Sequence, residues 1–327
     1  MFDSNMSFTR KLRVWLNRTD IKDYFVPFGG SVLLILLGNI LTPGFASFRS
    51  VLNLLALSSM LVIVCVSQQF VIMARGIDLG ISGLMILGVA WGGALSGGTT
   101  LGLLKAMFYM AAIGAFCGFI EGISVTRWAV PALVATMSVG KVLTNSYMAV
   151  THGTPAGAIA PVLKTIGIGN IGGVRWLLIV AIAVTIIMEL VLKKTKFGSK
   201  LYLVGANYKA ARIAGISSAR ITVICYVLAG IFGAISGFLL LGMIGAMNAN
   251  MTAEYVMLSI TACVIGGTSM DGGKGSFIGT ALGAVFMTLL TTVLSSINIP
   301  AGARSAIQGV ILMIILCVYC RGPKLRQ

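Results

Sequence analysis

Apolar stretches of about 20 residues recur along almost the whole chain, and each is long enough to cross a bilayer. Of the 327 residues, 57% are hydrophobic and only 10% are charged, whereas a soluble domain carries about a quarter charged residues. Lipid offers the backbone no hydrogen-bond partners, so the spans must be helices or a closed barrel. The stretches lack strict alternation, which argues against a barrel. The sequence therefore predicts an all-α, polytopic membrane helix bundle.

The apolar stretches divide the chain into ten predicted spans. They run roughly over residues 25–41, 51–73, 79–96, 102–124, 131–150, 175–193, 219–242, 254–267, 276–296 and 303–320. The third, eighth and tenth are short, and it stays open whether the eighth crosses fully. We expect one transmembrane domain over 25–320, with short polar segments at 1–24 and 321–327. Spans 2–5 and 7–10 have opposite orientation, and each set holds a Gly-acidic turn, as in an inverted repeat.

The positive charges agree with this topology. With the N-terminus in the cytoplasm, eighteen of the 24 lysines and arginines fall in inside segments and four in outside segments. Membrane proteins concentrate Lys and Arg on the cytoplasmic side, so both termini are expected there. The net charge of +16 is thus explained by basic loops between the spans. The partner it implies is the lipid bilayer, and nucleic-acid binding is excluded. Residues 8–24 are either an interfacial amphipathic helix or an ordered basic tail.

No set of residues suggests an enzyme or a bound cofactor. Cys317-x-x-Cys320 has no second pair, and His152 is the single histidine, so we predict no metal site. The glycine-rich run Gly266–Ser276 fails the spacing of a phosphate-binding loop. Any ATP hydrolysis must therefore occur on another subunit.

Polar residues in the fifth span are the best candidates for lining a pathway. Lys141 is the deepest charge of the chain, and Thr136, Ser138 and Asn145 share its span. Such groups usually face a bundle interior or a wet path, although hydrogen bonding between helices is the alternative. Asp78, at the start of the third span, joins this candidate set.

Two acidic residues lie about four residues inside their spans. Glu121 is near Arg127, and Glu189 is near Lys193. Each glutamate is expected either to pair with its basic neighbour or to act in transport.

Four sequence segments together carry a family resemblance. They are Gly76-Ile77-Asp78-Leu79 with Ser82-Gly83, Pro131–Thr136, Thr195–Gly198 followed by Val204–Ile216, and Val264–Ser276. In order and spacing they resemble the membrane permeases of ribose-type sugar ABC importers. The chain departs from that family's pattern at Tyr208, Lys209, Val256 and Asp271.

The resemblance implies a permease subunit in the bacterial cytoplasmic (inner) membrane that carries a sugar or sugar-like solute. It implies two permease copies or paralogues forming the pathway, and an ABC ATPase subunit holding ATP and Mg²⁺. The ATPase would dock on the loop 193–218, where residues 207–215 can form a short helix. The residues that match the docking motif are Gly205, Asn207, Ala210, Ala211, Arg212 and Gly215.

The resemblance also implies a solute-binding protein at the outer face. The outer segment 151–174 contacts this protein or is a plain connection, and the contact candidates are His152, Lys164 and Glu254. Two other functions remain open. An ion-coupled secondary transporter would need no ATPase, and a membrane scaffold would move no solute.

Overall fold

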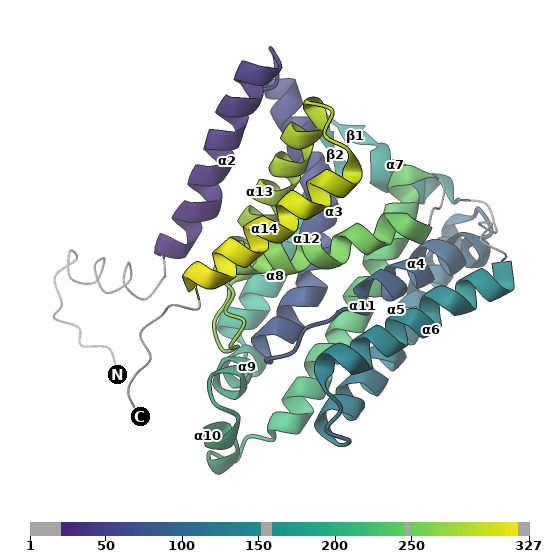
Figure 1. Ribbon diagram of the computed structural model, residues 1–327. Coiled ribbons are helices and arrows are strands. Elements are labelled where there is room, and N and C mark those ends of the chain that lie inside the picture. The colour runs from purple at the N-terminus through teal and green to yellow at the C-terminus, as the bar shows by residue number, and fades with distance from the viewer. Residues whose placement is uncertain (1–20, 152–158, 246–248, 320–327) are drawn as a thin grey trace, which may run out of the picture.

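The computed structural model describes residues 21–151, 159–245 and 249–319, and the described chain is a bundle of helices (Figure 1). Its α-helices are α2 (Ile21–Leu41), α3 (Phe48–Met73), α4 (Ile81–Ser96), α5 (Thr100–Thr126), α6 (Ala132–Thr151), α7 (Pro161–Ile168), α8 (Trp176–Lys194), α9 (Lys196–Ala206), α10 (Tyr208–Ile213), α11 (Ser218–Ile244), α12 (Ala253–Ile265), α13 (Phe277–Ser296) and α14 (Ala301–Tyr319). A short 3-10 helix, η1 (Ala249–Thr252), precedes α12. Strands β1 (Asn170–Ile171) and β2 (Val174–Arg175) pair antiparallel, with Asn170 opposite Arg175.

The predicted all-α membrane bundle is confirmed. Each predicted span coincides with a helix, namely α2 to α6, α8 and α11 to α14. Of these, α2, α3, α5, α8, α11 and α13 are long and apolar enough to cross a membrane, while α4, α12 and α14 hold shorter apolar stretches. Most of the N-terminal segment and the whole tail 321–327 lie outside the described residues.

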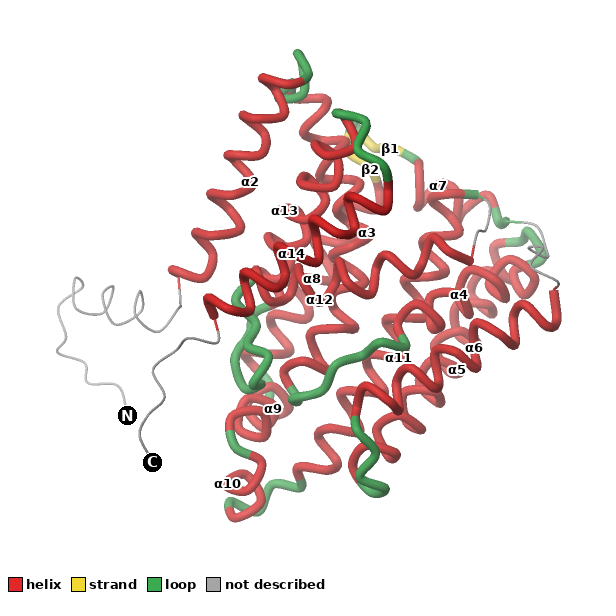
Figure 2. Tube along the Cα trace, viewed as in Figure 1, coloured by secondary structure: helices red, strands yellow, loops and turns green. Residues whose placement is uncertain are grey.

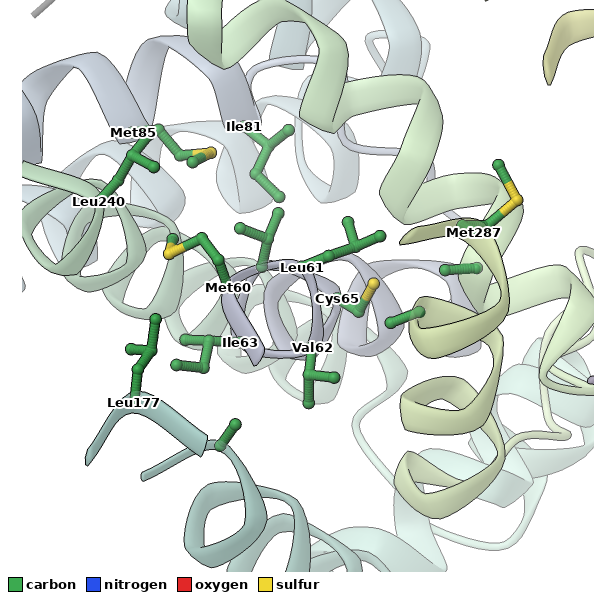
Figure 3. Close-up of a cluster of buried hydrophobic side chains, with 14 of the residues drawn as sticks. Met60, Leu61, Val62, Ile63, Cys65, Ile81, Met85, Leu177, Leu240 and Met287 are labelled. Atoms are coloured by element: carbon green, nitrogen blue, oxygen red, sulfur yellow. The ribbon is translucent and has the colours of Figure 1, made fainter. Parts of the chain in front are cut away.

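Helix α3 is the centre of the bundle. Nearly every residue from Leu54 to Met73 is buried, as expected for a helix that is apolar on all sides. Figure 3 shows side chains leaving successive positions of α3 in different directions, among side chains from α4, α8, α11 and α13. Helices α4, α8, α11 and α13 are thus arranged around one enclosed helix.

Glycines set the distance between α5 and α11. A Cβ on Gly230 of α11 would overlap the carbonyl oxygen of Gly114 on α5, and a Cβ on Gly118 would overlap the carbonyl oxygen of Tyr226. Lipid tails are as apolar as the side chains, so helices in a bilayer associate by close packing of small residues rather than by escape from water. The missing side chains let these two backbones touch.

Helix α2, the first that the structure describes, packs chiefly on α13. Helix α2 lies against α13, where the Tyr24 hydroxyl donates a hydrogen bond to Ser276 Oγ at 2.9 Å. The opposite face of α2 exposes large apolar side chains such as Phe25 and Ile40, which suit contact with lipid. Figure 1 shows α2 and α14 on one side of the bundle and α4, α5 and α6 on the other.

The two ends of the bundle differ. Helices α9 and α10 lie at one end, called here the α10 end, and α7 with the β1–β2 hairpin lies at the opposite end, called the α7 end (Figure 1). The loop between α3 and α4 does not stay at an end. Figure 2 shows it running through the middle of the bundle before α4 begins. This interruption brings loop residues, Asp78 among them, into the interior.

Candidate functional site

The segment predicted as a docking loop folds into two short helices. The hydroxyl of Thr195 accepts a hydrogen bond from the Gly198 N–H at 3.2 Å and caps α9. The side-chain oxygen of Asn207 accepts one from the Ala210 N–H at 3.0 Å and caps α10; both residue types are favoured at helix starts. Gly215, at φ 77°, lets the chain turn after α10. The short helix expected within 207–215 is confirmed, whereas α9 was not predicted.

The docking residues form an exposed layer and a buried layer. Asn207, Ala210, Arg212 and Gly215 are exposed at the α10 end, and Gly205 and Ala211 are buried beneath them. Ile213, beside Arg212, is 89% exposed. The surface of α10 therefore offers a cation and an apolar side chain together, which suits contact with another protein.

Gly205 lies where three backbone segments converge. A Cβ on Gly205 would overlap both the carbonyl oxygen of Met73, at the end of α3, and the N–H of Gly273, in the loop between α12 and α13. The Gly273 N–H also donates a hydrogen bond to the Met73 carbonyl at 3.1 Å. We call this meeting of α9, α3 and the loop 266–276 the junction. It has no room for a side chain at residue 205.

Arg75 holds the junction from the α3 side. Its Nε donates to the Gly205 carbonyl and its Nη2 to the Ala206 carbonyl, each at 2.6 Å. Carbonyls at the end of a helix have no partner within the helix, and a positive charge is favoured there. The guanidinium therefore satisfies the end of α9 and fixes its position on α3.

The loop 266–276 is anchored on its other side by Glu189 of α8. The carboxylate accepts hydrogen bonds from the Phe277 N–H at 2.7 Å and the Ser276 hydroxyl at 3.0 Å, at the start of α13, where negative charge is favoured. It also pairs with Lys193 at 2.6 Å. The expected pairing of Glu189 with its basic neighbour is therefore confirmed.

Tyr202 of α9 adds a further tie to this loop. Its hydroxyl donates a hydrogen bond to the Gly275 carbonyl at 2.7 Å. Burial, together with the negative charge of Glu189, raises the pKa of the Tyr202 phenol. The hydroxyl thus keeps its proton and remains a donor.

Asp78 and Glu121 form a buried carboxyl pair inside the bundle. Both are fully buried, and a Cβ on Gly80 would lie 3.2 Å from one Asp78 oxygen and 3.0 Å from one Glu121 oxygen. The second Asp78 oxygen and both Glu121 oxygens have no hydrogen-bond partner among the described residues. The expected pairing of Glu121 with Arg127 is wrong, because Glu121 points into the bundle while Arg127 is exposed.

The turn that carries Asp78 is tied to two helices. In the amide orientation that satisfies both atoms, the Gln68 side chain of α3 donates to the Asp78 carbonyl at 3.0 Å and accepts from its N–H at 3.3 Å. The Thr136 hydroxyl of α6 accepts from the Leu79 N–H at 3.1 Å. The structure thus brings two pathway candidates, Asp78 and Thr136, together in the interior.

The two buried glutamates should differ in how strongly the fold depends on their charge. Glu121→Gln is expected to change the free energy of unfolding by less than about 1 kcal/mol, because neither Glu121 oxygen has a hydrogen-bond partner among the described residues and the amide therefore removes no hydrogen bond. Glu189→Gln should lower it by about 3 kcal/mol, because it leaves Lys193 and the start of α13 without their anion. Thermal unfolding in detergent measures both. Equal losses would contradict this account of Glu121.

The other candidates on α6 lie on a different face from Thr136. Ser138, Lys141 and Asn145 are all exposed, and positions three, four and seven residues apart share one side of a helix. Exposed apolar residues such as Val142 flank them. A lysine facing lipid in mid-span would be costly, so this polar stripe needs water or a partner beside it.

A cavity of about 450 Å³ lies toward the α7 end, between α3, the end of α11, α12 and α13. Glu254 and Tyr255 line it, together with the hydroxyl-bearing residues Thr288, Thr291 and Thr292. Lys164 is exposed on α7, which belongs to the same end. His152 lies outside the described residues.

The known proteins that this chain resembles in sequence are permeases. The family described as branched-chain amino acid transport system / permease component matches residues 50–316. The chain belongs to this permease family. It is 28% identical to the ribose import permease protein RbsC of Escherichia coli K12 over 88% of this chain and 90% of that one. It is 30% identical to the autoinducer 2 import system permease protein LsrC of Enterobacter sp. 638 over 84% and 80%. No solved structure matches it.

Several residues that organise the permease could not be singled out from its sequence. From the sequence, Arg75 is only one of the basic residues assigned to the cytoplasmic side, Gly273 is only one glycine of the run 266–276, and nothing distinguishes Tyr202. Their partners lie far along the chain, for example 130 residues apart for Arg75 and Gly205. The one available signal was the Gly-rich composition of 266–276, which indicated close approach of backbones without naming the partner.

Proposed function

We propose that this permease is the membrane subunit of an ATP-driven importer in the bacterial cytoplasmic membrane. It would pass a sugar or sugar-like solute, delivered by a solute-binding protein, and bind no cofactor itself. The observation that carries this proposal is the α10 end, where an exposed basic and apolar helix follows α9, and α9 is fixed to the core by the close backbone contacts of Gly205. Such a surface suits a separate cytoplasmic ATPase that holds ATP and Mg²⁺.

The pathway is proposed to run along the polar stripe of α6. Ser138, Lys141 and Asn145 are exposed in a single copy of the chain, and a second permease copy or a paralogue would complete the enclosure. Delivery would occur at the α7 end, where Lys164 and Glu254 are exposed. In this orientation the α10 end and both chain termini are cytoplasmic, as the charge distribution predicts.

The stripe can be tested by its access to water. In a background without Cys317 and Cys320, we expect Asn145→Cys to react with a membrane-impermeant maleimide about tenfold faster than Leu190→Cys, since the reactive thiolate forms in water and not in lipid. Leu190 is an exposed apolar position on α8 and serves as the lipid-facing control. Equally slow labelling at both positions would remove the stripe from the pathway.

The function itself is tested by reconstitution. The chain is purified with the ATPase and the binding protein that are encoded beside it, and uptake of radiolabelled ribose into proteoliposomes is followed together with ATP hydrolysis. We expect the ATPase to co-purify, hydrolysis to rise when the loaded binding protein is added, and uptake to need all three proteins. A chain that neither retains the ATPase nor changes its hydrolysis would overturn the proposal.

A second function is favoured by one observation. The unpaired buried carboxyls of Asp78 and Glu121 are a type of group that ion-coupled transporters use within the membrane. Uptake by this chain alone, driven by a proton or Na⁺ gradient in the same proteoliposomes, would support that function against the first.

A further inference from the structure

Arg75 occupies a strained backbone position at the end of α3. Its φ is 67°, a left-handed value that is uncommon for any residue with a side chain. Strained positions persist where the surroundings fix them, and they often lie in switch regions. Here the surroundings are the two carbonyls of α9 that accept its hydrogen bonds, each at 2.6 Å. Glycine would suit this backbone better, so the guanidinium must account for an arginine here.

The junction gives α9 little freedom to move independently of α3. Gly205 contacts the backbones of Met73 and Gly273 so closely that a Cβ would overlap both, and a Cβ on Gly272 would lie 2.5 Å from the Arg75 side chain. Helix α10 follows α9 after a single residue, Asn207. A displacement of the surface of α10 therefore reaches the end of α3 through backbone contacts and the Arg75 guanidinium.

From Arg75 a short connection leads to α6. Three residues further along the loop is Asp78, held by Gln68, and next to it the Leu79 N–H donates to Thr136 of α6 at 3.1 Å. Helix α6 is also in backbone contact with this turn, because a Cβ on Gly80 would lie 2.5 Å from the Thr136 carbonyl oxygen. The polar stripe lies on the exposed side of that same helix.

We infer that Arg75 is a positioning residue that couples α9 and α10 to α6, so that movement imposed at the α10 end changes the exposure of the polar stripe. The inference rests on the proposed function, because it takes an ATPase as the source of that movement. It assigns Arg75 no contact with the ATPase or with the solute. Its role is to keep the end of α9 and the α3–α4 turn moving as one unit.

The test uses Arg75→Gly, which removes the guanidinium but accepts the left-handed backbone without strain. The readout is maleimide labelling of Asn145→Cys in the reconstituted complex, with and without ATP. With Arg75 present, we expect ATP to change the labelling rate by about tenfold, within the usual range of coupling between sites. With Arg75→Gly, the close backbone contacts of Gly205 with Met73 and Gly273 still hold α9 and α10 in place, so the ATPase should still co-purify and hydrolyse ATP. Labelling should no longer respond to ATP.

Two further variants separate coupling from other effects. Arg127→Gln removes an exposed arginine from the loop between α5 and α6 and should leave the ATP response intact. Arg75→Lys keeps the charge but cannot form the two-pronged contact with adjacent carbonyls, so it should restore only part of the response.

The outcomes of this experiment separate the role of Arg75 from the proposed function of the permease. An unchanged ATP response in Arg75→Gly overturns the inference and leaves the proposed function standing. Loss of ATPase co-purification in Arg75→Gly also overturns it, because Arg75 would then support docking rather than coupling. If the complex with Arg75 intact fails to bind the ATPase, the proposed function fails first.

Discussion

Gly230→Leu is expected to prevent this permease from folding, with a loss of about 3 kcal/mol or more in the free energy of unfolding. The reason is that Gly230 and Gly114 bring the backbones of α11 and α5 into contact, so a side chain overlaps a carbonyl oxygen rather than a flexible group. Helix α11 cannot move aside, because it also packs closely on α4, where a Cβ on Gly237 would overlap the Met85 carbonyl. Thermal unfolding and gel filtration in detergent measure the effect.

Gly29→Leu is the matched control for this substitution. Gly29 lies in α2, and a Cβ there has nothing within 4 Å. The same increase in size should therefore leave the folded yield and the melting temperature close to those of the unaltered permease. If both variants unfold alike, the effect comes from helix propensity or insertion, and the close contact of α5 with α11 is not what stabilises the bundle.

Gly205→Ala is expected to have the second largest effect, on assembly rather than on insertion. The added methyl group would overlap the Met73 carbonyl and the Gly273 N–H, so α9 must move away from the junction, and α10 with it. We expect co-purification of the ATPase and solute uptake to fall by about tenfold or more, while the amount of inserted protein stays similar. Pull-down of the complex and uptake into proteoliposomes measure these effects.

Gly309→Ala provides the comparison for Gly205→Ala. Gly309 lies in α14, and a Cβ there has open space around it, so assembly and uptake should be unchanged. Normal assembly of Gly205→Ala would mean that the junction accommodates the added methyl group and that the position of α10 does not depend on the junction.

The spanning helices were predictable because an apolar segment long enough to cross a bilayer can be recognised without knowing which helices it packs against. Each span is a continuous apolar run, and the turn after α10 is signalled by Gly215, so neither depends on knowing what packs where. Helix α9 was missed because it is only 11 residues long, too short to cross the bilayer, and contains two glycines. Its cap, Thr195, is a residue type favoured at helix starts, but the partner of its hydroxyl is a backbone N–H that almost any residue could supply, so the sequence does not single it out.

The candidate site was only partly predictable because its geometry depends on distant partners. Glu189 and Lys193 are four residues apart on one helix, so their pairing could be expected. Glu121 has a basic neighbour six residues away, yet from α5 it faces Asp78 in the loop between α3 and α4, and no local pattern indicates that. The glycines at 114, 118 and 122 are spaced as in a packing face, but the sequence does not say which helix they meet.

The contact between α2 and α13 has a consequence for how the chain is made. Tyr24 and Ser276 are separated by 252 positions, so α2 leaves the ribosome long before its main partner. At about 5–20 residues per second, α2 waits for tens of seconds in the bilayer before α13 is synthesised. During that interval its Gly30, which later lies against Phe286, offers a small-residue face to any neighbouring helix. Slower translation would prolong this stage.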